Sequence, residues 1–511
     1  MYIEPSAQPF AARYATGEPQ VVWTTLVADL ETPVSAYLKV AGARPEGSAP
    51  MSFLLESVEG GAVRGRYSII GLDPDVIFRV NGRHAEINRT VQTDPAAFVP
   101  IEDAPLAALR DLIGTSGIAL PPSLPPMAAG VFGYLGYDMV RLIEDLPPPG
   151  PDPIGIPDAI LLRPTLVVVF DAVKDTMTVV TPVRAHPGVT AKAALTRAVE
   201  RLSAVVDALD RPLDKSAATD VDAGPLDVKP RSNTTADEFK QMVLRAKDYI
   251  AAGDIFQVVL SQRFEAPFKL PPFSLYRALR RVNPSPYLFF LDFGAFAVAG
   301  SSPEILVKTS NGVVTVRPIA GTRPRGATPH EDAALEAELL ADPKERAEHL
   351  MLLDLGRNDV GRVADIGTVE VTDQFFIERY SQVMHIVSNV EGKLRHDRDA
   401  LDALTAGFPA GTVSGAPKVR AMEIIDELEK EKRALYAGCV GYFSAGEEMD
   451  TCIVLRTALI KDGTMYVQAG AGIVADSDPG FEQQECINKA AALFRAAEEA
   501  KRFASAARRG Q

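Results

Sequence analysis

The chain has 511 residues, a hydrophobic content of 47% and a formal net charge of −14, from 53 basic and 67 acidic side chains. This length predicts two domains or one large layered body, and the acidic balance argues against a broad nucleic-acid-binding surface. The most apolar run, residues 159–170, is interrupted by Arg163 and Pro164, so no membrane span is expected. Three cysteines without metal-site spacing, and a start that lacks a signal pattern, favour a reduced, cytoplasmic setting.

One stretch has the composition of a linker. Residues 209–233 are rich in Asp, Pro and Ala and poor in large apolar side chains. This segment predicts an N-terminal part over residues 1–208 and a C-terminal part over residues 234–511.

Tight-turn dipeptides between apolar runs predict β-hairpins in both parts. The dipeptides are Asn81-Gly82, Asn311-Gly312 and Asp462-Gly463. Both central residues of a type I′ turn need a positive φ, which these residue types tolerate. Residues 165–183 predict a fourth hairpin with a longer connection, so antiparallel sheet should dominate.

Four segments carry helix signals. Thr235-x-x-Glu238 is a capping box, and Gly253 closes the helix that follows it. Pro417 precedes an amphipathic segment, and Asp-Pro pairs at 342–343 and 478–479 begin two more helices. Strands and helices do not alternate in a βαβ rhythm, which favours an α+β fold.

The two Asp-Pro helices each carry a Glu-x-x-Glu run. Glu345 and Glu348 lie on one face of the first helix, and Glu482 and Glu485 on one face of the second. Four carboxylates brought together would call for a hard cation such as Mg²⁺. The alternative for each is local: Glu345 fits a capping box, Glu482 suits a helix N-terminus, and Glu485 can pair with Lys489.

Arg456 interrupts an apolar strand pattern. Alternation places it on one face with Cys452, Val454, Ala458 and Ile460. A buried guanidinium needs an anion. That anion is either a structural carboxylate or a substrate carboxylate held in bidentate fashion.

Three further features are candidates for chemistry. His385 lies in a predicted strand and is either structural or a proton handler. Glu304 is the only acid of an apolar strand region, where desolvation would favour its protonated form, unless it is exposed at a strand start. Gly470, Ala471 and Gly472 follow the last strand and form either a tight bend or an anion-binding backbone segment.

Long motifs in a fixed order resemble those of chorismate-utilising enzymes, and within them the large subunits of anthranilate synthases. The motifs are PIAGTRPRG (318–326), LLDLGRNDVGRV (352–363), HIVSNVEG (385–392), FPAGTVSGAPK (408–418), AGCVGYF (437–443), AGAGIVADSDP (469–479) and FEQQECINKA (481–490). The resemblance is dense over residues 237–495 and looser around residues 53–61 and 65–74. It implies two packed, mainly antiparallel sheets with helices outside and the active site in a cleft.

The resemblance also implies a reaction. Chorismate and ammonia would give anthranilate and pyruvate, the first committed step of tryptophan biosynthesis. A separate glutamine amidotransferase subunit would supply the ammonia, since no cysteine here lies in a glutaminase motif.

Site residues follow from the same resemblance. Glu348 and Glu485 would ligate Mg²⁺, with Glu345 and Glu482 in support. The expected catalytic residues are Glu304 as general acid, His385 for the later elimination, Gln257 and Thr322. The expected substrate-binding residues are Thr412, Tyr436, Arg456, Gly470, Ala471, Gly472 and Lys489.

Two positions discriminate between reactions in this group. Gln257 stands where the water-adding relatives have lysine, and a neutral amide cannot deprotonate water. Ala320 stands where aminodeoxychorismate synthases use a lysine nucleophile. These residues favour direct addition of ammonia. An aminodeoxychorismate synthase and a non-catalytic tryptophan-binding regulatory subunit are the alternatives.

A tryptophan site is the last expectation. In the resembling subunits a Leu-Leu-Glu-Ser segment and an Asn-Pro-x-x-Tyr segment bind the inhibitor. The corresponding residues here are Leu55, Glu56, Ser57, Pro284, Ser285 and Tyr287, with Glu56 opposite the amino group. A strand end and a proline turn explain the same segments without a ligand. A site formed by both parts of the chain could couple ligand binding to activity.

Overall fold

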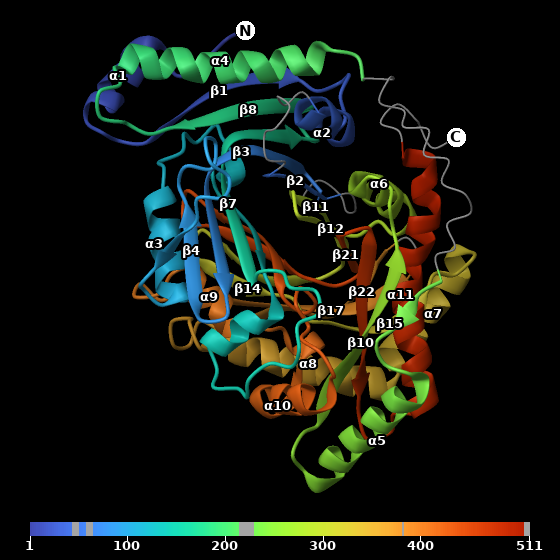
Figure 1. The fold of residues 1–511 in the computed structure, drawn as a ribbon. Coiled ribbons are helices and arrows are strands. Elements are labelled where there is room, and N and C mark those ends of the chain that lie inside the picture. The colour runs from blue at the N-terminus through green and yellow to red at the C-terminus, as the bar shows by residue number, and fades with distance from the viewer. Residues whose placement is uncertain (43–50, 58–64, 214–228, 381–382, 505–511) are drawn as a thin grey trace.

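The computed structural model describes residues 1–42, 51–57, 65–213, 229–380 and 383–504. Every strand pairing in this part of the chain is antiparallel, and the pairings link the strands into one continuous sheet. Figure 1 shows the sheet curling through the molecule with helices on its outside. The expected α+β class with mainly antiparallel sheet is confirmed.

The strands alternate with few helices in the first half of the chain. They are β1 (Gln20–Val27), β2 (Met51–Glu56), β3 (Tyr67–Asn81), β4 (His84–Asn88), β5 (Val99–Ile101), β6 (Gly130–Leu135), β7 (Ala159–Asp171), β8 (Thr176–Val183) and β9 (Arg231–Ser232). The second half adds β10 (Gln257–Pro267), β11 (Tyr287–Phe293), β12 (Phe296–Ser302), β13 (Ile305–Ser310), β14 (Val313–Val316), β15 (Ile319–Pro324), β16 (Glu370–Arg379), β17 (Val383–Lys393), β18 (Gly415–Ala416), β19 (Cys439–Ser444), β20 (Met449–Ile453), β21 (Thr457–Lys461) and β22 (Thr464–Ile473).

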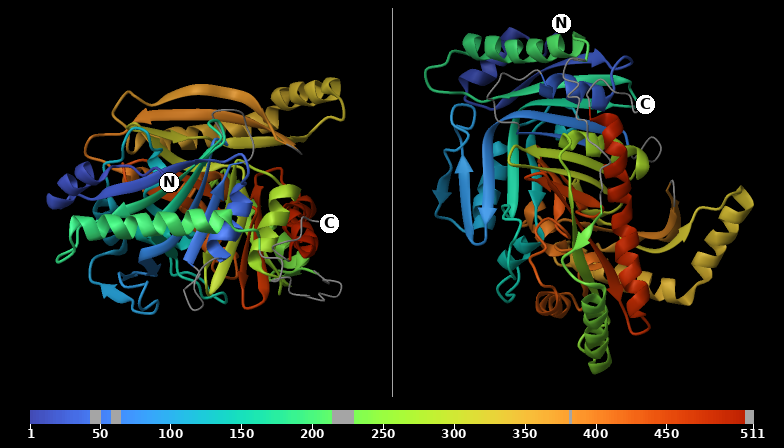
Figure 2. Two further views of the ribbon diagram at one scale, coloured as in Figure 1. Left: turned by 90° about the horizontal axis from the view of Figure 1, so that it is seen from above. Right: turned by 45° about the vertical axis from the view of Figure 1, so that its right-hand side comes forward.

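The helices cover the outer faces. They are α1 (Ala7–Ala15), α2 (Pro33–Gly42), α3 (Pro105–Ser116), α4 (Ala191–Asp210), α5 (Ala236–Ala252), α6 (Pro272–Val282), α7 (Pro329–Ala341), α8 (Pro343–Gly361), α9 (Ala400–Gly407), α10 (Lys418–Leu428) and α11 (Pro479–Glu499). Figure 2 shows α4 lying across the top of the molecule and α11 running along one side.

The inner faces of the curled sheet pack against each other. Phe53 of β2 stacks on Phe132 of β6 with ring centroids 4.6 Å apart, although these strands are not paired. Tyr134 of β6 likewise meets Phe293 and Phe296 across the interior. The two sheets that were expected are therefore two layers of one hydrogen-bonded sheet.

Strands of the N-terminal and C-terminal parts pair directly. β2 pairs with β11, and β6 pairs with β19. The two parts on either side of residues 209–233 therefore share the sheet, and residues 214–228 of that segment lie outside the described chain.

Local signals located most elements. Asn311-Gly312 and Asp462-Gly463 form the predicted two-residue turns with positive φ at both positions. In the β3–β4 hairpin, by contrast, Asn81 pairs with His84, so the turn lies one residue later than predicted. The capping box at Thr235 and Glu238 is present, and Gly253 ends α5 in the left-handed conformation.

Two backbone predictions were wrong. Arg456 does not continue a strand: β20 ends at Ile453, β21 begins at Thr457, and Arg456 has φ +48°. The predicted shared face with Cys452 and Ala458 therefore does not exist. Gly470 to Gly472 form no loop either, because they lie inside β22 and pair with β10.

Candidate active site

A cavity of about 530 Å³ lies where β10, β15, β17, β22, α8 and α11 meet. Its size suits a small organic substrate. Most of the predicted residues line it: Gln257, Glu304, Ala320, Thr322, Glu345, Glu348, His385, Thr412, Tyr436, Arg456, Gly470, Gly472, Glu482, Glu485 and Lys489. Ala471 is buried in the hydrophobic core instead, since neighbouring strand residues point to opposite faces.

Both Glu-x-x-Glu runs reach this cavity from the first two turns of α8 and α11. Asp342 caps α8 by accepting hydrogen bonds from the backbone N–H groups of Lys344 and Glu345. The Glu345 side chain does not close a capping box but accepts a hydrogen bond from Arg323 at 3.1 Å. The capping interpretation therefore holds for Asp342, while Glu345 lines the cavity and is held there by Arg323.

The carboxylates of Glu348, Glu482 and Glu485 form a cluster in which like charges repel one another. Burial raises the pKa of Glu348, and the nearby charges of Glu345 and Glu485 raise it further. Burial also raises the pKa of Glu482 to about 6, with Glu485 adding to the shift. Lys489 offsets part of this charge through an ion pair with Glu485 at 2.7 Å. A cluster of this kind gains stability from a cation.

Carboxylate oxygens are the ligands that Mg²⁺ prefers, so the donor set fits that ion. Among the described residues, no three His, Cys, Asp or Glu side chains are grouped closely enough to hold an ion on their own. Mg²⁺ commonly keeps waters and takes further ligands from its substrate. One or two of these glutamates with a carboxylate substrate would therefore complete such a site.

Glu304 lies in the short link between β12 and β13 and is only 6% exposed. Burial raises the pKa of its carboxyl group to about 8, against the opposing effect of the Thr412 hydroxyl, which lies 3.1 Å from Oε1. Glu304 is therefore protonated at neutral pH. The burial and raised pKa expected from its apolar surroundings are both present.

His385 keeps the opposite protonation state in the same cavity. Burial, followed by the charge of Arg456, lowers its pKa to about 4. Its Nδ1 lies 3.0 Å from the carbonyl oxygen of Gly321 and 3.1 Å from Oγ1 of Thr322. Because a carbonyl only accepts, Nδ1 carries the proton and Nε2 is left as a base.

Arg456 is the cavity residue whose partner the sequence left open. Burial lowers its pKa, and within the described chain its guanidinium makes no ion pair or hydrogen bond. Tyr380 and Glu304 lie near the guanidinium without forming a salt bridge with it. A structural carboxylate partner is thus excluded among the described residues, and an incoming anion can take that place.

Two glycines of β22 make room for cavity side chains. A Cβ on Gly472 would come within 2.6 Å of the Gln257 amide nitrogen, and one on Gly470 within 2.7 Å of the Tyr436 hydroxyl. Gln257 uses that nitrogen to donate to Glu348 at 3.2 Å. Its Oε1 is buried and has no protein partner among the described residues.

A second cavity, of about 500 Å³, adjoins the first. Leu55, Glu56, Ser57 and Tyr287 line it, as expected for the predicted tryptophan site. Pro284 and Ser285 do not; the next proline in that segment, Pro286, lines the wall instead.

The two cavities share a thin wall. Pro303 and Ile319 line both of them. Between these residues, Glu304 lines the catalytic cavity and Ile305 lines the second one. Neighbouring residues of one short segment thus form parts of two different sites.

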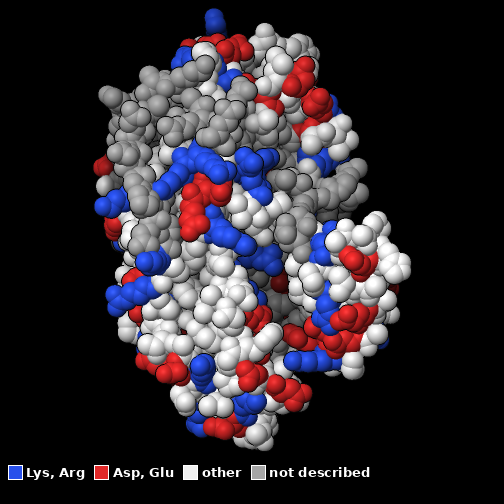
Figure 3. Space-filling model, turned by 90° about the vertical axis from the view of Figure 1, so that its right-hand side faces the viewer, with Lys and Arg blue, Asp and Glu red and all other residues white. Residues whose placement is uncertain are grey.

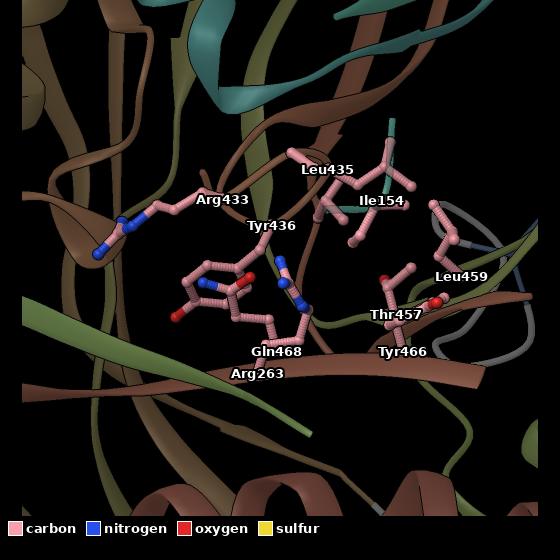
Figure 4. Close-up of a pocket in the computed structure, with 11 residues that line it drawn as sticks. Ile154, Arg263, Arg433, Leu435, Tyr436, Thr457, Leu459, Tyr466 and Gln468 are labelled. Atoms are coloured by element: carbon pink, nitrogen blue, oxygen red, sulfur yellow. The ribbon is translucent and has the colours of Figure 1, made fainter. Parts of the chain in front are cut away.

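A small pocket of about 30 Å³ lies behind the catalytic cavity (Figure 4). Tyr436 and Gln468 line both spaces. In Figure 4 these two side chains lie together with Arg263, and Thr457 and Tyr466 stand on the far side of the pocket.

The surface view in Figure 3 shows a hollow beside a projecting lobe of the molecule. On this face basic side chains gather around an acidic patch above the hollow, and elsewhere basic and acidic side chains are interspersed. No helix of the described chain is long and apolar enough to cross a membrane.

Sequence reasoning missed several residues of the catalytic cavity. Arg323 holds both Glu345 and the α8 cap Asp342, the latter at 2.8 Å. Lys344, Gln468, Ser477 and Phe481 also line the cavity. Arg323 lies in the motif PIAGTRPRG, but its role depends on the distant helix α8, which no local pattern places.

Comparisons with known proteins agree with this geometry. Residues 53–495 match the chorismate binding enzyme family. The anthranilate synthase component 1 of Cereibacter sphaeroides is 58% identical over 507 residues, covering 99% of this chain and 100% of that protein. That of Pseudomonas putida is 50% identical over 92% of this chain and 93% of its own.

Solved structures show the same fold. Anthranilate synthase component I of Streptococcus pneumoniae superposes with a TM-score of 0.74 at 37% identity, covering 92% of this chain and 99% of that one. The menaquinone-specific isochorismate synthase of Escherichia coli has a TM-score of 0.68 at 21% identity, over 96% and 100% of the two chains. By sequence, cavity and fold, this chain belongs to the chorismate binding enzymes.

Proposed function

We propose that this chain is the chorismate-converting subunit of an anthranilate synthase, which catalyses the first committed step of tryptophan biosynthesis. Chorismate and ammonia would give anthranilate, pyruvate and water. The observation that carries the proposal is the content of the larger cavity. It combines a carboxylate cluster, a guanidinium without a carboxylate partner, a protonated acid and a neutral imidazole.

Binding would use the two charged ends of this cavity. Arg456 binds the enolpyruvyl carboxylate of chorismate, and Tyr436 with the backbone around Gly470 and Gly472 bounds that end. Glu348 and Glu485, supported by Glu345 and Glu482, would hold Mg²⁺. When bound, Mg²⁺ supplies positive charge for the ring carboxylate and relieves the repulsion among the glutamates.

The first chemical step adds ammonia at ring C2. As the C2–N bond forms, the ring double bonds shift, and the C4 hydroxyl leaves as water after Glu304 donates its proton. The raised pKa of Glu304 supports this role, because the acid is loaded at neutral pH. Thr412 holds its carboxyl group in place.

The second step makes the ring aromatic. Nε2 of His385 accepts the C2 proton, the C2–H electron pair enters the ring, and the C3–O bond to the enolpyruvyl group breaks. Thr322 and the Gly321 carbonyl fix the tautomer that leaves Nε2 unprotonated.

Two uncharged residues determine which nucleophile attacks the ring. Gln257 cannot deprotonate water, and Ala320 offers no covalent nucleophile. Both line the cavity. They support ammonia over water, and direct addition over a lysine-bound intermediate.

Ammonia is proposed to come from a separate glutamine amidotransferase subunit. The component 1 relatives are named as one part of a larger enzyme, and the three cysteines of this chain are buried. A cytoplasmic location belongs to the same proposal. Tryptophan is proposed to inhibit the enzyme from the second cavity, through the wall that contains Glu304.

The test is direct. The purified chain, mixed with chorismate, Mg²⁺ and an ammonium salt, should produce anthranilate fluorescence, whereas glutamine should not replace ammonium. Arg456→Gln should raise KM for chorismate strongly. Formation of isochorismate or aminodeoxychorismate, or no turnover at all, would contradict the proposal.

A further inference from the structure

Strand β10 borders the catalytic cavity, and part of one of its edges has no neighbouring strand. β18 pairs with this edge at Gln257 and Val258, and β9 pairs with it again from Phe264 onward. Among the described strands, none pairs with this edge between those two points. The backbone groups in the gap need other partners, because a buried N–H or C=O group without a hydrogen bond is destabilising.

A buried ion pair fills this gap. Arg433 donates to both carboxylate oxygens of Glu429, from Nε at 2.9 Å and from Nη2 at 2.6 Å. The Glu429 carboxylate also accepts a hydrogen bond from the backbone N–H of Ser261 at 2.8 Å. Nη2 of Arg433 donates to the carbonyl oxygen of Val259 at 2.7 Å. The ion pair therefore binds backbone groups of β10 as a neighbouring strand would.

The same guanidinium reaches the segment that carries Thr412. Nη1 of Arg433 donates to the carbonyl oxygen of Val413 at 2.7 Å. Thr412, the preceding residue, donates from its hydroxyl to Glu304 at 3.1 Å. Both residues belong to the short 3-10 helix η3 (Gly411–Val413), whose three residues depend on such contacts for their position. Arg433 thus connects β10 to the residue that holds the proposed general acid.

The ion pair lies behind the cavity wall. The side chains of Arg433 and Glu429 are 1% and 6% exposed, and neither lines the catalytic cavity. Removing two charges from water offsets much of their attraction, so a buried pair adds little net stability. The planar guanidinium, however, makes directional hydrogen bonds to several fixed acceptors at once. Its Cζ also lies 4.9 Å from the ring centroid of Tyr137, which restricts the tilt of its plane.

We propose that Arg433, held by Glu429, is a positioning residue for the general acid Glu304. It fixes Val413 relative to β10, and so places the Thr412 hydroxyl that orients the Glu304 carboxyl group. This inference rests on the proposed function, in which Glu304 is the proton donor, and extends it to two residues outside the cavity. Arg433 itself binds no substrate and transfers no proton.

Arg433→Lys tests this role. Lysine keeps the positive charge, but its single nitrogen cannot span the carboxylate and both carbonyl oxygens. With chorismate, Mg²⁺ and ammonium, kcat should fall by about tenfold to a hundredfold, because the acid is misplaced. KM for chorismate should change much less, since this ion pair does not hold Arg456. A folded Arg433→Lys protein with the wild-type kcat would overturn the proposal.

A double-mutant cycle with Thr412→Val separates positioning from a general structural effect. Thr412→Val removes the hydroxyl through which Arg433 would act. Adding Arg433→Lys should therefore lower kcat little further, so the double variant should resemble Thr412→Val alone. Losses that multiply in the double variant would show that Arg433 acts by another route, and would overturn the proposal.

Arg141→Lys is the matched control. Arg141 also forms a largely buried ion pair, with Asp426 of α10 at 2.6 Å, and does not line the catalytic cavity. Its kcat should equal that of the wild type even where thermal melting shows a similar loss of stability. An equal loss of kcat in this control would overturn the positioning role.

Glu429→Gln provides a second variant should Arg433→Lys not fold. It keeps an acceptor oxygen but weakens the hold on Arg433, so kcat should fall in the same direction and again not multiply with Thr412→Val. Wild-type kcat in Glu429→Gln, or multiplying losses, would overturn the positioning role and leave the proposed function standing. A wild-type chain that forms no anthranilate would overturn both.

Discussion

Glu304 and His385 lie in one cavity, and burial moves their pKa values in opposite directions. The neutral form of each is favoured, which for a carboxyl group is the proton donor and for an imidazole the proton acceptor. Burial in one cavity thus prepares an acid and a base at the same pH. No ion pair is needed to set either state.

The pH dependence of turnover should report Glu304. With a pKa of about 8, its carboxyl group is protonated below that pH and loses its proton above it, so kcat should fall as pH rises through about 8. Glu304→Gln keeps the shape but cannot donate a proton, so kcat should drop by roughly 10²- to 10⁴-fold. Anthranilate fluorescence across pH 6 to 10 measures both, and an unchanged alkaline limb in the variant would assign that limb to another group.

Removing the imidazole should separate the two chemical steps. His385→Ala keeps Glu304, so ammonia addition should continue while loss of the C2 proton stalls. The aminated intermediate should then accumulate and be detectable by liquid chromatography. Normal anthranilate production without any intermediate would exclude His385 as the base.

Gly472 should affect activity because its missing side chain leaves room for the Gln257 amide. In Gly472→Ala the new Cβ would lie 2.6 Å from the Gln257 amide nitrogen, so Gln257 must leave Glu348. We expect kcat/KM with ammonium to fall by about tenfold to a hundredfold. Gly446→Ala is the control, since its Cβ would come no nearer than 4.0 Å to any neighbour.

Single elements depend mainly on local chemistry, which is why the sequence located them well. The turn at Asn311-Gly312 and the capping box of α5 follow from a few adjacent residues. Arg456 was misplaced because β propensity alone continues the strand, whereas Arg456 has a left-handed backbone between β20 and β21. The glycines of β22 were misjudged for a similar reason, since their small size serves Gln257 and Tyr436 rather than a bend.

The cap of α5 offers a test at this scale. Thr235 accepts a hydrogen bond from the backbone N–H of Glu238, and the Glu238 side chain accepts one from Thr235. Thr235→Ala should lower the free energy of unfolding by about 1 kcal/mol. Thr235→Ser, which keeps the hydroxyl, should retain most of it in urea denaturation. Equal losses in both variants would mean that the methyl group matters and the cap does not.

The sequence was least informative about the arrangement of distant segments in the whole molecule. The α+β class could be predicted from hairpin and helix signals, but the pairing of β2 with β11 and of β6 with β19 joins segments more than two hundred positions apart. The catalytic cavity is assembled from equally distant pieces. Only the resemblance to a known family indicated that Glu348 and Glu485 meet, because a periodic pattern describes one helix at a time.

Shared strands should make unfolding cooperative across the predicted linker. We expect one calorimetric transition for the full chain, since melting the N-terminal part would expose the edges of β11 and β19. A fragment of residues 234–511 should be poorly soluble for the same reason. Two well-separated transitions, or a soluble and active fragment, would show that the C-terminal part folds alone.

The wall formed by Pro303 and Ile319 has a consequence for metabolic engineering. Under the proposed inhibition by tryptophan, a strain designed to overproduce anthranilate needs a variant that no longer responds to tryptophan and keeps its turnover. Substitutions along the shared wall alter both sites at once, because Glu304 and Ile305 are adjacent in the chain. Tyr67 and Met127 line the second cavity and not the first, so changes there would alter the proposed inhibitor site alone. Directed libraries should therefore be concentrated there.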